Sequence, residues 1–251
     1  VLKSKLKKKK INFIATSRQK NSKYFLDLKN IKKFKLNKDL SSCVILAGIT
    51  DYYDCEKKKE LSRKVNCKNI IKISKEILKR NIFLCYVSTN TVFNSLSKQN
   101  EKDKPKPKFE YAKQKYYVEK NLIKYVKKNN KTNLLSILRL TKNVSTDIKP
   151  FQNWVIKIIN HKKIKAFDDL YFSPILFENS ADAIKKILSK KVQGIFHLSN
   201  KQNLNYYQFA TKLFLYLKID PKKIIKTNSK KEKVKLIFKN KKSALSMKYS
   251  R

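Results

Sequence analysis

The chain has 251 residues and a hydrophobic fraction of 41%, which fit one large domain, or a core domain with a smaller lobe. No apolar run approaches the ~20 residues that are needed to cross a bilayer, so a membrane protein is not expected. The net charge of +44 is compatible with nucleic-acid binding, but the basic residues are spread along the whole chain and almost all are lysine, which argues against specific recognition of nucleic acid.

The first part of the chain alternates short apolar runs with longer amphipathic ones. Strands are predicted at 11–17, 42–48, 81–89 and 133–140, and helices at 56–79 and 109–129. Strands that alternate with helices indicate parallel βαβ units with right-handed crossovers. We therefore predict an α/β fold with a Rossmann-like doubly wound parallel sheet.

The succession of predicted strands and helices changes after residue 150. Helices are predicted at 151–164, 180–191 and 205–218, and a strand at 194–200. The tail from Lys222 is rich in lysine and poorly patterned. We interpret residues 1–150 as the core domain and residues 151–251 as mainly a smaller lobe that packs on the sheet.

Small and polar residues follow the ends of the predicted strands. In an open parallel sheet, ligands bind beyond the carboxyl ends of the strands, so these residues are candidates for a binding site. They are Ser17, Arg18, Ala47, Gly48, Thr50, Ser88, Thr89 and Asn90.

Tyr111 and Lys115 lie about one turn apart on the same face of the predicted helix 109–129. A lysine-rich chain produces this spacing by accident, as Tyr116 and Lys120 do, so the pair alone carries little weight. Beside Thr89, however, a phenol with an ammonium near it could protonate a carbonyl oxygen during hydride transfer from a nicotinamide cofactor. We expect the lysine to lower the pKa of the phenol.

Several motifs in the same order resemble the extended short-chain dehydrogenase/reductases, and most closely the dTDP-4-dehydrorhamnose reductase group of sugar-nucleotide-binding proteins. The motifs are "STNTVFNS" (88–95), "YAKQKYYVEK" (111–120), "SILRL" (136–140), "FDDLYFSPILFENSADAI" (167–184) and "GIFHLSNKQNLNYYQFA" (194–210). The resemblance implies an NAD(P)-binding domain over 1–150 and mainly a substrate-binding lobe over 151–251. Asn66 and Glu119 also match positions of the family's motifs.

The resemblance also implies roles for individual residues. Thr89, Tyr111 and Lys115 would be the catalytic triad, and Asn90, Asn153 and Ser173 would contact the nucleotide sugar. Arg18, with no acidic residue beside it, favours NADPH over NADH, although NADH stays possible. His161 and His197 are interpreted as structural. The implied cofactor-binding residues are Ser17, Arg18, Asp27, Leu28, Ala47, Gly48, Thr50, Tyr111 and Lys115.

The sequence departs from the family pattern at its start. The family begins with a strand and a glycine-rich turn that holds the pyrophosphate, but the glycines here are Gly48 and Gly194 alone. The opening "VLKSKLKKKK" resembles the end of the helix after that turn, so the first strand and the loop are apparently missing. We therefore expect a truncated chain with weak dinucleotide binding and doubtful activity. Asn90 and Thr91 also replace the family's acidic residue and tyrosine, which leaves the substrate open.

The leading hypothesis is an NADPH-dependent reductase of a 4-keto-6-deoxy sugar nucleotide that serves surface polysaccharide synthesis. An epimerase or dehydratase of the same superfamily is the nearest alternative, because the fold alone does not select the reaction. A non-catalytic subunit that binds a nucleotide sugar or NADP, and a polyanion-binding protein, are further alternatives. We expect a cytoplasmic protein with reduced thiols, without a metal, and with a homodimer as a possibility.

Overall fold

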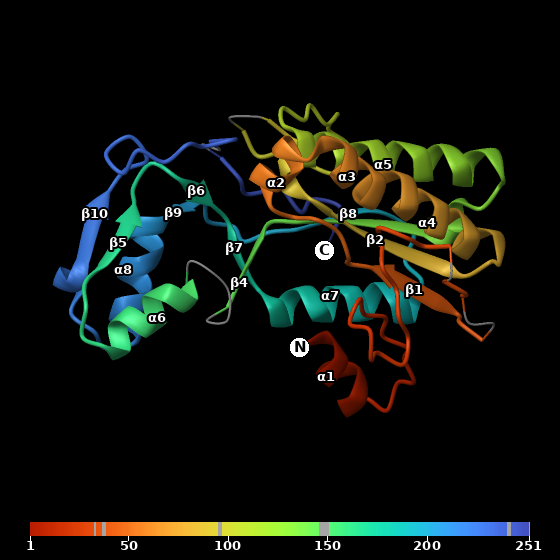
Figure 1. Ribbon diagram of the computed structural model, residues 1–251, viewed down its shortest axis with the longest axis horizontal. Helices are drawn as coiled ribbons and strands as arrows, with labels where there is room; N and C mark the ends of the chain where they lie inside the picture. The colour runs from red at the N-terminus through yellow and green to blue at the C-terminus, as the bar shows by residue number, and fades with distance from the viewer. Residues whose placement is uncertain (33, 37–38, 95–96, 146–150, 240–241, 251) are drawn as a thin grey trace.

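A four-stranded parallel sheet with the order β1-β2-β3-β8 forms the centre of the protein (Figure 1). The computed structural model describes residues 1–32, 34–36, 39–94, 97–145, 151–239 and 242–250. The strands of the sheet are β1 (Ser42–Ile45), β2 (Phe83–Thr89), β3 (Leu135–Leu140) and β8 (Gly194–Leu198). β2 and β3 are almost entirely buried, as parallel strands are when helices cover both faces of their sheet.

Helices cover both faces of this sheet, which confirms the predicted α/β class (Figure 1). α4 (Ile70–Lys79) and α5 (Glu110–Lys128) pack on one face. α7 (Phe177–Lys190) packs on the other face, and α1 (Leu2–Lys8) lies against α7, where Lys5 pairs with Asp182. The apolar stripes of α4 and α5 meet the sheet in the largest core cluster of the described residues.

A smaller lobe lies at one end of the sheet and has an aromatic core (Figure 1). In this lobe, β5 (Ile164–Phe167) pairs in parallel with β10 (Ile224–Thr227), and α6 (Phe151–Ile159) and α8 (Tyr206–Tyr216) pack against β5. Two short ladders join the lobe to the sheet. They are β4 (Lys142–Val144) with β7 (Pro174–Leu176), and β6 (Tyr171–Phe172) with β9 (Leu204–Asn205).

The predicted helix over 56–79 is divided in the structure. It consists of α2 (Tyr52–Lys57), α3 (Lys59–Arg63), the π-helical segment η1 (Lys64–Asn69) and α4. Asp51 caps α2, because its carboxylate accepts a hydrogen bond from the backbone N–H of Asp54 at 2.8 Å. Single 3₁₀ turns complete the regular structure at η2 (Asn90–Val92), η3 (Thr132–Leu134) and η4 (Pro221–Lys223).

The strand predicted at 11–17 is wrong. Only Ser17 makes a β-bridge there, with Phe25, and Ile11 is exposed. Because no described strand lies beside this segment, its apolar residues cannot join a ladder. The helix predicted at 151–164 is too long, since the backbone at His161 takes a positive φ of 54° before β5 begins. The predicted boundary at residue 150 lies outside the described residues.

None of the described helices is long and apolar enough to cross a membrane.

The packing of α5 on the sheet yields a stability prediction. Leu122 is fully buried, so Leu122→Ala should lower the free energy of unfolding by about 2–5 kcal/mol, as cavity-forming substitutions do. Leu215→Ala is the matched control, because Leu215 is 62% exposed and its truncation should cost little. Urea denaturation of both variants measures the difference, and equal losses would contradict this description of the core.

Candidate functional site

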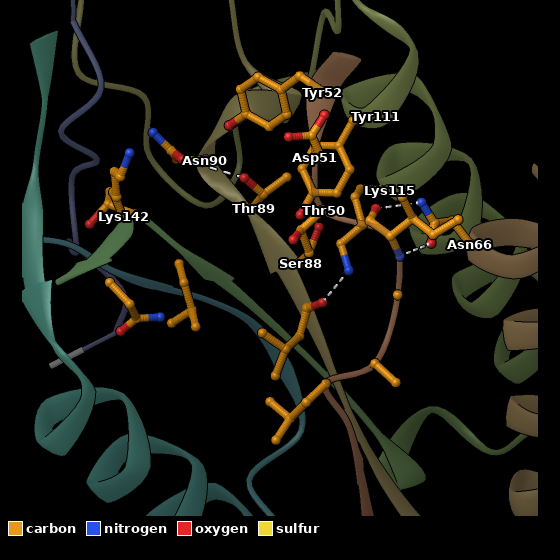
Figure 2. Close-up of a pocket in the computed structure, with 18 of the residues that line it drawn as sticks. Thr50, Asp51, Tyr52, Asn66, Ser88, Thr89, Asn90, Tyr111, Lys115 and Lys142 are labelled. Atoms are coloured by element: carbon orange, nitrogen blue, oxygen red, sulfur yellow. Dashed lines mark hydrogen bonds between the residues drawn. The ribbon is translucent and has the colours of Figure 1, made fainter. Parts of the chain in front are cut away.

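A cavity of about 950 Å³ opens at the carboxyl edge of the central sheet (Figure 2). The ends of β1, β2 and β3 form its floor, and α2, the start of α5 and the start of α7 form its walls. The segment 235–238 from the lysine-rich tail completes the lining. The predicted residues that line it are Ala47, Gly48, Thr50, Ser88, Thr89, Asn90, Tyr111 and Lys115.

Tyr111 stands at the first turn of α5 and is buried against other aromatic rings. Its ring stacks on Tyr52 with centroids 5.3 Å apart, and Phe109 lies beside both rings. Burial raises the pKa of the Tyr111 phenol, and the nearby Tyr52 and Cys55 raise the pKa further. This shift is opposite to the predicted one, so the phenol is neutral and holds its proton at pH 7.

Lys115 lies one turn further along α5 and points to the carbonyl edge of β2. Its Nζ donates to the carbonyl oxygen of Val87 at 2.6 Å and lies 4.5 Å from the centroid of the Tyr86 ring (Figure 2). Burial lowers the pKa of this ammonium to about 8, although the negative charge of Glu119 opposes the fall. The charge of this lysine therefore changes as the pH passes about 8.

Thr89 ends β2 and takes part in a cluster of hydroxyl and amide groups. Its Oγ1 accepts from the backbone N–H of Thr91 at 3.2 Å and lies 3.1 Å from the Thr91 hydroxyl. It also donates to Asn90 Oδ1 at 3.4 Å, and the Asn90 amide donates to the carbonyl oxygen of Ser243 at 2.8 Å. A residue near the end of the chain thus fixes one wall of the cavity.

Asn66 holds the loop that follows β1. From the π-helical segment η1, its side chain accepts from the backbone N–H of Ile49 and donates to the carbonyl oxygen of Ile49, both at 2.8 Å. The same amide donates to Gln114 of α5 at 2.7 Å. A Cβ atom on Gly48 would lie 2.9 Å from Asn66 Oδ1, so this close approach needs glycine. Single π turns of this kind occur often at functional sites.

Two buried polar atoms in the wall of the cavity have no protein partner. Ser88 Oγ and Tyr86 Oη, both on β2, make no hydrogen bond to any described residue. Buried polar atoms are normally hydrogen-bonded, so this wall suits a polar ligand such as the nicotinamide and ribose of a dinucleotide. In this respect the residues of the cavity fit the predicted cofactor.

Six predicted binding residues are not among those that line the cavity. Asp27 Oδ1 accepts from the backbone N–H of Lys29, and the carbonyl oxygen of Leu28 accepts from Asn69. Ser173 is buried and bonds to Ser199 Oγ at 3.1 Å and to the carbonyl oxygen of Asn200 at 3.0 Å. The others are Ser17 and Arg18, in the segment before β1, and Asn153, on the exposed side of α6.

Some residues that line the cavity were not predicted from the sequence. Tyr52 is one of them, and its position after β1 follows the same rule of strand ends that identified Thr50. Lys142 is another, and its Nζ donates to the Tyr206 hydroxyl of the smaller lobe at 2.6 Å. No pattern in the sequence distinguishes this lysine from the others. Among the described residues, no three metal-ligating side chains form a cluster.

Comparisons with known proteins relate the whole chain to one family. A family model described as the RmlD substrate binding domain matches residues 1–251. A comparison with curated protein sequences found no match.

Solved structures share the fold. dTDP-4-dehydrorhamnose reductase from Yersinia enterocolitica has 21% identity and a TM-score of 0.80, over 99% of this chain and 86% of that one. The Bacillus anthracis reductase, solved in complex with NADP, has 18% identity and a TM-score of 0.79, over 98% and 84%. UDP-glucose 4-epimerase from Thermotoga maritima has 12% identity and a TM-score of 0.80, over 99% and 86%. At these identities, the likeness concerns the fold alone.

The loop held by Asn66 yields a prediction. Asn66→Ala removes four hydrogen bonds and leaves Ile49 and Gln114 with lost partners, so the variant should lose about 1–3 kcal/mol of unfolding free energy. Hydrogen exchange at the Ile49 amide should become faster. Asn121→Ala is the control, because Asn121 only donates to a carbonyl oxygen on the exposed face of α5. Unchanged exchange at Ile49 would show that Asn66 does not hold the loop.

Proposed function

The chain belongs to the RmlD substrate binding domain family, and on that premise we propose that it uses NADPH to reduce the keto group of a 4-keto-6-deoxy sugar nucleotide. The family membership agrees with the resemblance that the motifs of the sequence indicate. The observation that carries the proposal is that Thr89, Tyr111 and Lys115 line one cavity at the carboxyl edge of the sheet. This edge is where parallel sheets of this class bind their ligands.

Tyr111 is the proposed proton donor. Because its pKa is raised, the phenol is protonated throughout the neutral range, and it can give its proton to the basic oxygen that forms as a carbonyl is reduced. The Thr89 hydroxyl would hydrogen-bond the same oxygen and orient the carbonyl. The Lys115 ammonium would stabilise the phenolate that remains after the transfer.

NADPH would supply the hydride when it is bound. The residues of this chain that would hold its nicotinamide and ribose are the loop from Ala47 to Thr50, Ser88 and Lys115, because they line the cavity beside Tyr111. Ser17, Arg18, Asp27 and Leu28 stay predicted contacts of the adenosine half. The preference for NADPH over NADH depends on Arg18 and is supported by the NADP in the related Bacillus anthracis reductase.

The substrate half of the cavity contains Asn90, Tyr52 and Lys142. These groups combine amide and hydroxyl hydrogen bonding with one cation, which suits a sugar that carries a diphosphate. Asn153 and Ser173 stay predictions from the resemblance. A surface polysaccharide pathway and a cytoplasmic location are part of the same proposal.

An epimerase is the second candidate function. UDP-glucose 4-epimerase from Thermotoga maritima matches this fold with the same TM-score as the Yersinia enterocolitica reductase. A phenol, a lysine and a threonine at the sheet edge serve either reaction, because both exchange a hydride and a proton at a sugar carbon. Net oxidation of NADPH in the presence of substrate separates a reductase from an epimerase.

The phenol of Tyr111 can be tested directly. Tyr111→Phe should reduce the rate of NADPH oxidation with a dTDP-4-keto-6-deoxy sugar by about 10²–10⁴-fold, while NADPH binding is retained. Tyr117→Phe is the control on the same helix, because the Tyr117 side chain is exposed. Turnover by Tyr111→Phe at the rate of the unmodified protein would exclude the phenol as the proton donor.

The pH dependence of turnover should follow Lys115. Its pKa is lowered to about 8, so the ammonium is present below that pH and is lost as the pH rises through it. The rate at saturating substrate should therefore fall as the pH passes about 8. Lys115→Arg keeps the cation at high pH, so any activity that it retains should lack this fall. The same fall in both proteins would assign the titration to another group.

A further inference from the structure

A row of buried polar side chains lies between the central sheet and α5, behind the cavity. Ser88 of β2, Arg139 of β3 and His197 of β8 occupy neighbouring positions of the parallel register. From α5, Glu119 meets Arg139 in this row, so the row faces the helix that carries Tyr111 and Lys115. The function proposed above uses neither the carboxylate nor the guanidinium.

Glu119 and Arg139 form a fully buried ion pair. The Nη2 of Arg139 donates to Glu119 Oε2 at 2.6 Å, and its Nε lies 3.1 Å from Oε1 and 3.2 Å from Oε2. The two side chains are 0% and 3% exposed. Apolar residues of similar volume often replace such a pair without loss of stability, so stability alone is a weak reason for these charges.

His197 and Phe93 hold Arg139 from its other side. His197 Nδ1 lies 2.9 Å from the carbonyl oxygen of Ser246 and donates to it, which leaves Nε2 to accept from Arg139 Nη1 at 3.4 Å. Burial lowers the pKa of His197 to about 4, so the ring is neutral and adds no charge to the row. The Phe93 ring lies 5.0 Å from the guanidinium carbon. These contacts hold the Arg139 guanidinium in the orientation in which it bonds to Glu119.

Glu119 stands one helical turn after Lys115, on the same side of α5. The other groups near the lysine are the Tyr86 ring and the Cys67 thiol, and the Tyr111 phenol lines the same cavity. Burial raises the pKa of each of these three groups, so all are neutral near pH 7. Glu119 is thus the carboxylate whose charge acts on Lys115 among the described residues.

We propose that Glu119 is a positioning residue for the reaction: held by Arg139, its carboxylate keeps the Lys115 ammonium charged at the wall of the cavity. The inference rests on the proposed function, in which Lys115 stabilises the phenolate of Tyr111. Arg139 prevents the carboxylate from turning away, and His197 completes the arrangement without a charge of its own. The carboxylate that acts on Lys115 therefore belongs to the same helix, α5.

The protonation of Lys115 can be measured without turnover. Competitive acetylation with acetic anhydride at a series of pH values, followed by mass spectrometry of the peptide with Lys115, gives the pH at which half of the amine is reactive. In Glu119→Gln this pH should fall by about one unit, because the attraction of a nearby opposite charge is lost. An unchanged value in this folded variant would overturn the proposal.

Two further variants make the test sharper. Glu76→Gln is the matched control, because it removes a carboxylate from the exposed Glu76–Arg80 pair of α4 and should leave the reactivity of Lys115 unchanged. Because Glu119→Gln leaves Arg139 without its partner, the double variant Glu119→Gln with Arg139→Gln replaces the ion pair by two amides that can bond to each other. The half-reactive pH of the double variant should also lie below that of the unmodified protein, and an unchanged value would refute the inference.

The acetylation result is independent of the proposed reaction. If the half-reactive pH of Lys115 falls in Glu119→Gln and in the double variant, but the unmodified protein reduces no sugar nucleotide, the proposed function fails and the effect of Glu119 stands. If the protein is an active reductase and Lys115 does not shift, the role of Glu119 fails alone. In an active enzyme, Glu119→Gln should also move the fall of kcat to lower pH by the same amount, which a purely structural residue would not do.

Discussion

The partly buried ammonium of Lys115 on α5 is the constraint around which the site is arranged. A cation that is removed from water loses its hydration and must find partners in the protein. Here it has the Val87 carbonyl oxygen, the face of the Tyr86 ring and the charge of Glu119. Each of these partners requires a particular register: β2 must end beside the second turn of α5, and β3 must bring Arg139 opposite Glu119.

The cavity is built from parts of the chain that are distant in sequence. The sheet and α5 supply the groups with altered pKa values, and Asn66 fixes the loop after β1 beside them. The smaller lobe reaches the same cavity through β4, where Lys142 meets the hydroxyl of Tyr206. The proposed catalytic groups thus lie on the sheet and α5, and the groups proposed to bind a substrate lie toward the smaller lobe.

Most of the central architecture was predictable because its elements are long and strongly patterned. β2, β3 and α5 carry continuous apolar runs or a clear helical face, and the Tyr111–Lys115 pair follows from helical geometry alone. Segment 11–17 has a similar apolar composition and yet forms no strand, since pairing depends on a neighbour that no local pattern reveals. The π turn around Asn66 was also unpredictable, because each of its backbone hydrogen bonds spans only one residue more than in an α-helix.

Electrostatic properties were harder to predict than positions. The sequence places a cation near the phenol, from which a lowered pKa follows, but the fold also buries the phenol beside Tyr52 and Cys55. Desolvation raises the pKa of the phenol, and the Lys115 ammonium is directed to the Val87 carbonyl oxygen. The direction of such a shift depends on what surrounds a group in three dimensions, and residue spacing along a helix does not contain that information.

The contact between Asn90 and Ser243 has a consequence for how the protein is made. These residues are separated by 153 positions, and Ser246 and Ser250 contact His197 across 49 and 53 positions. Because synthesis proceeds from the N-terminus, the strands of the central sheet are made before the segment around Ser243 that closes this wall. The cavity therefore acquires its final shape only when this long loop closes, which carries an entropic cost.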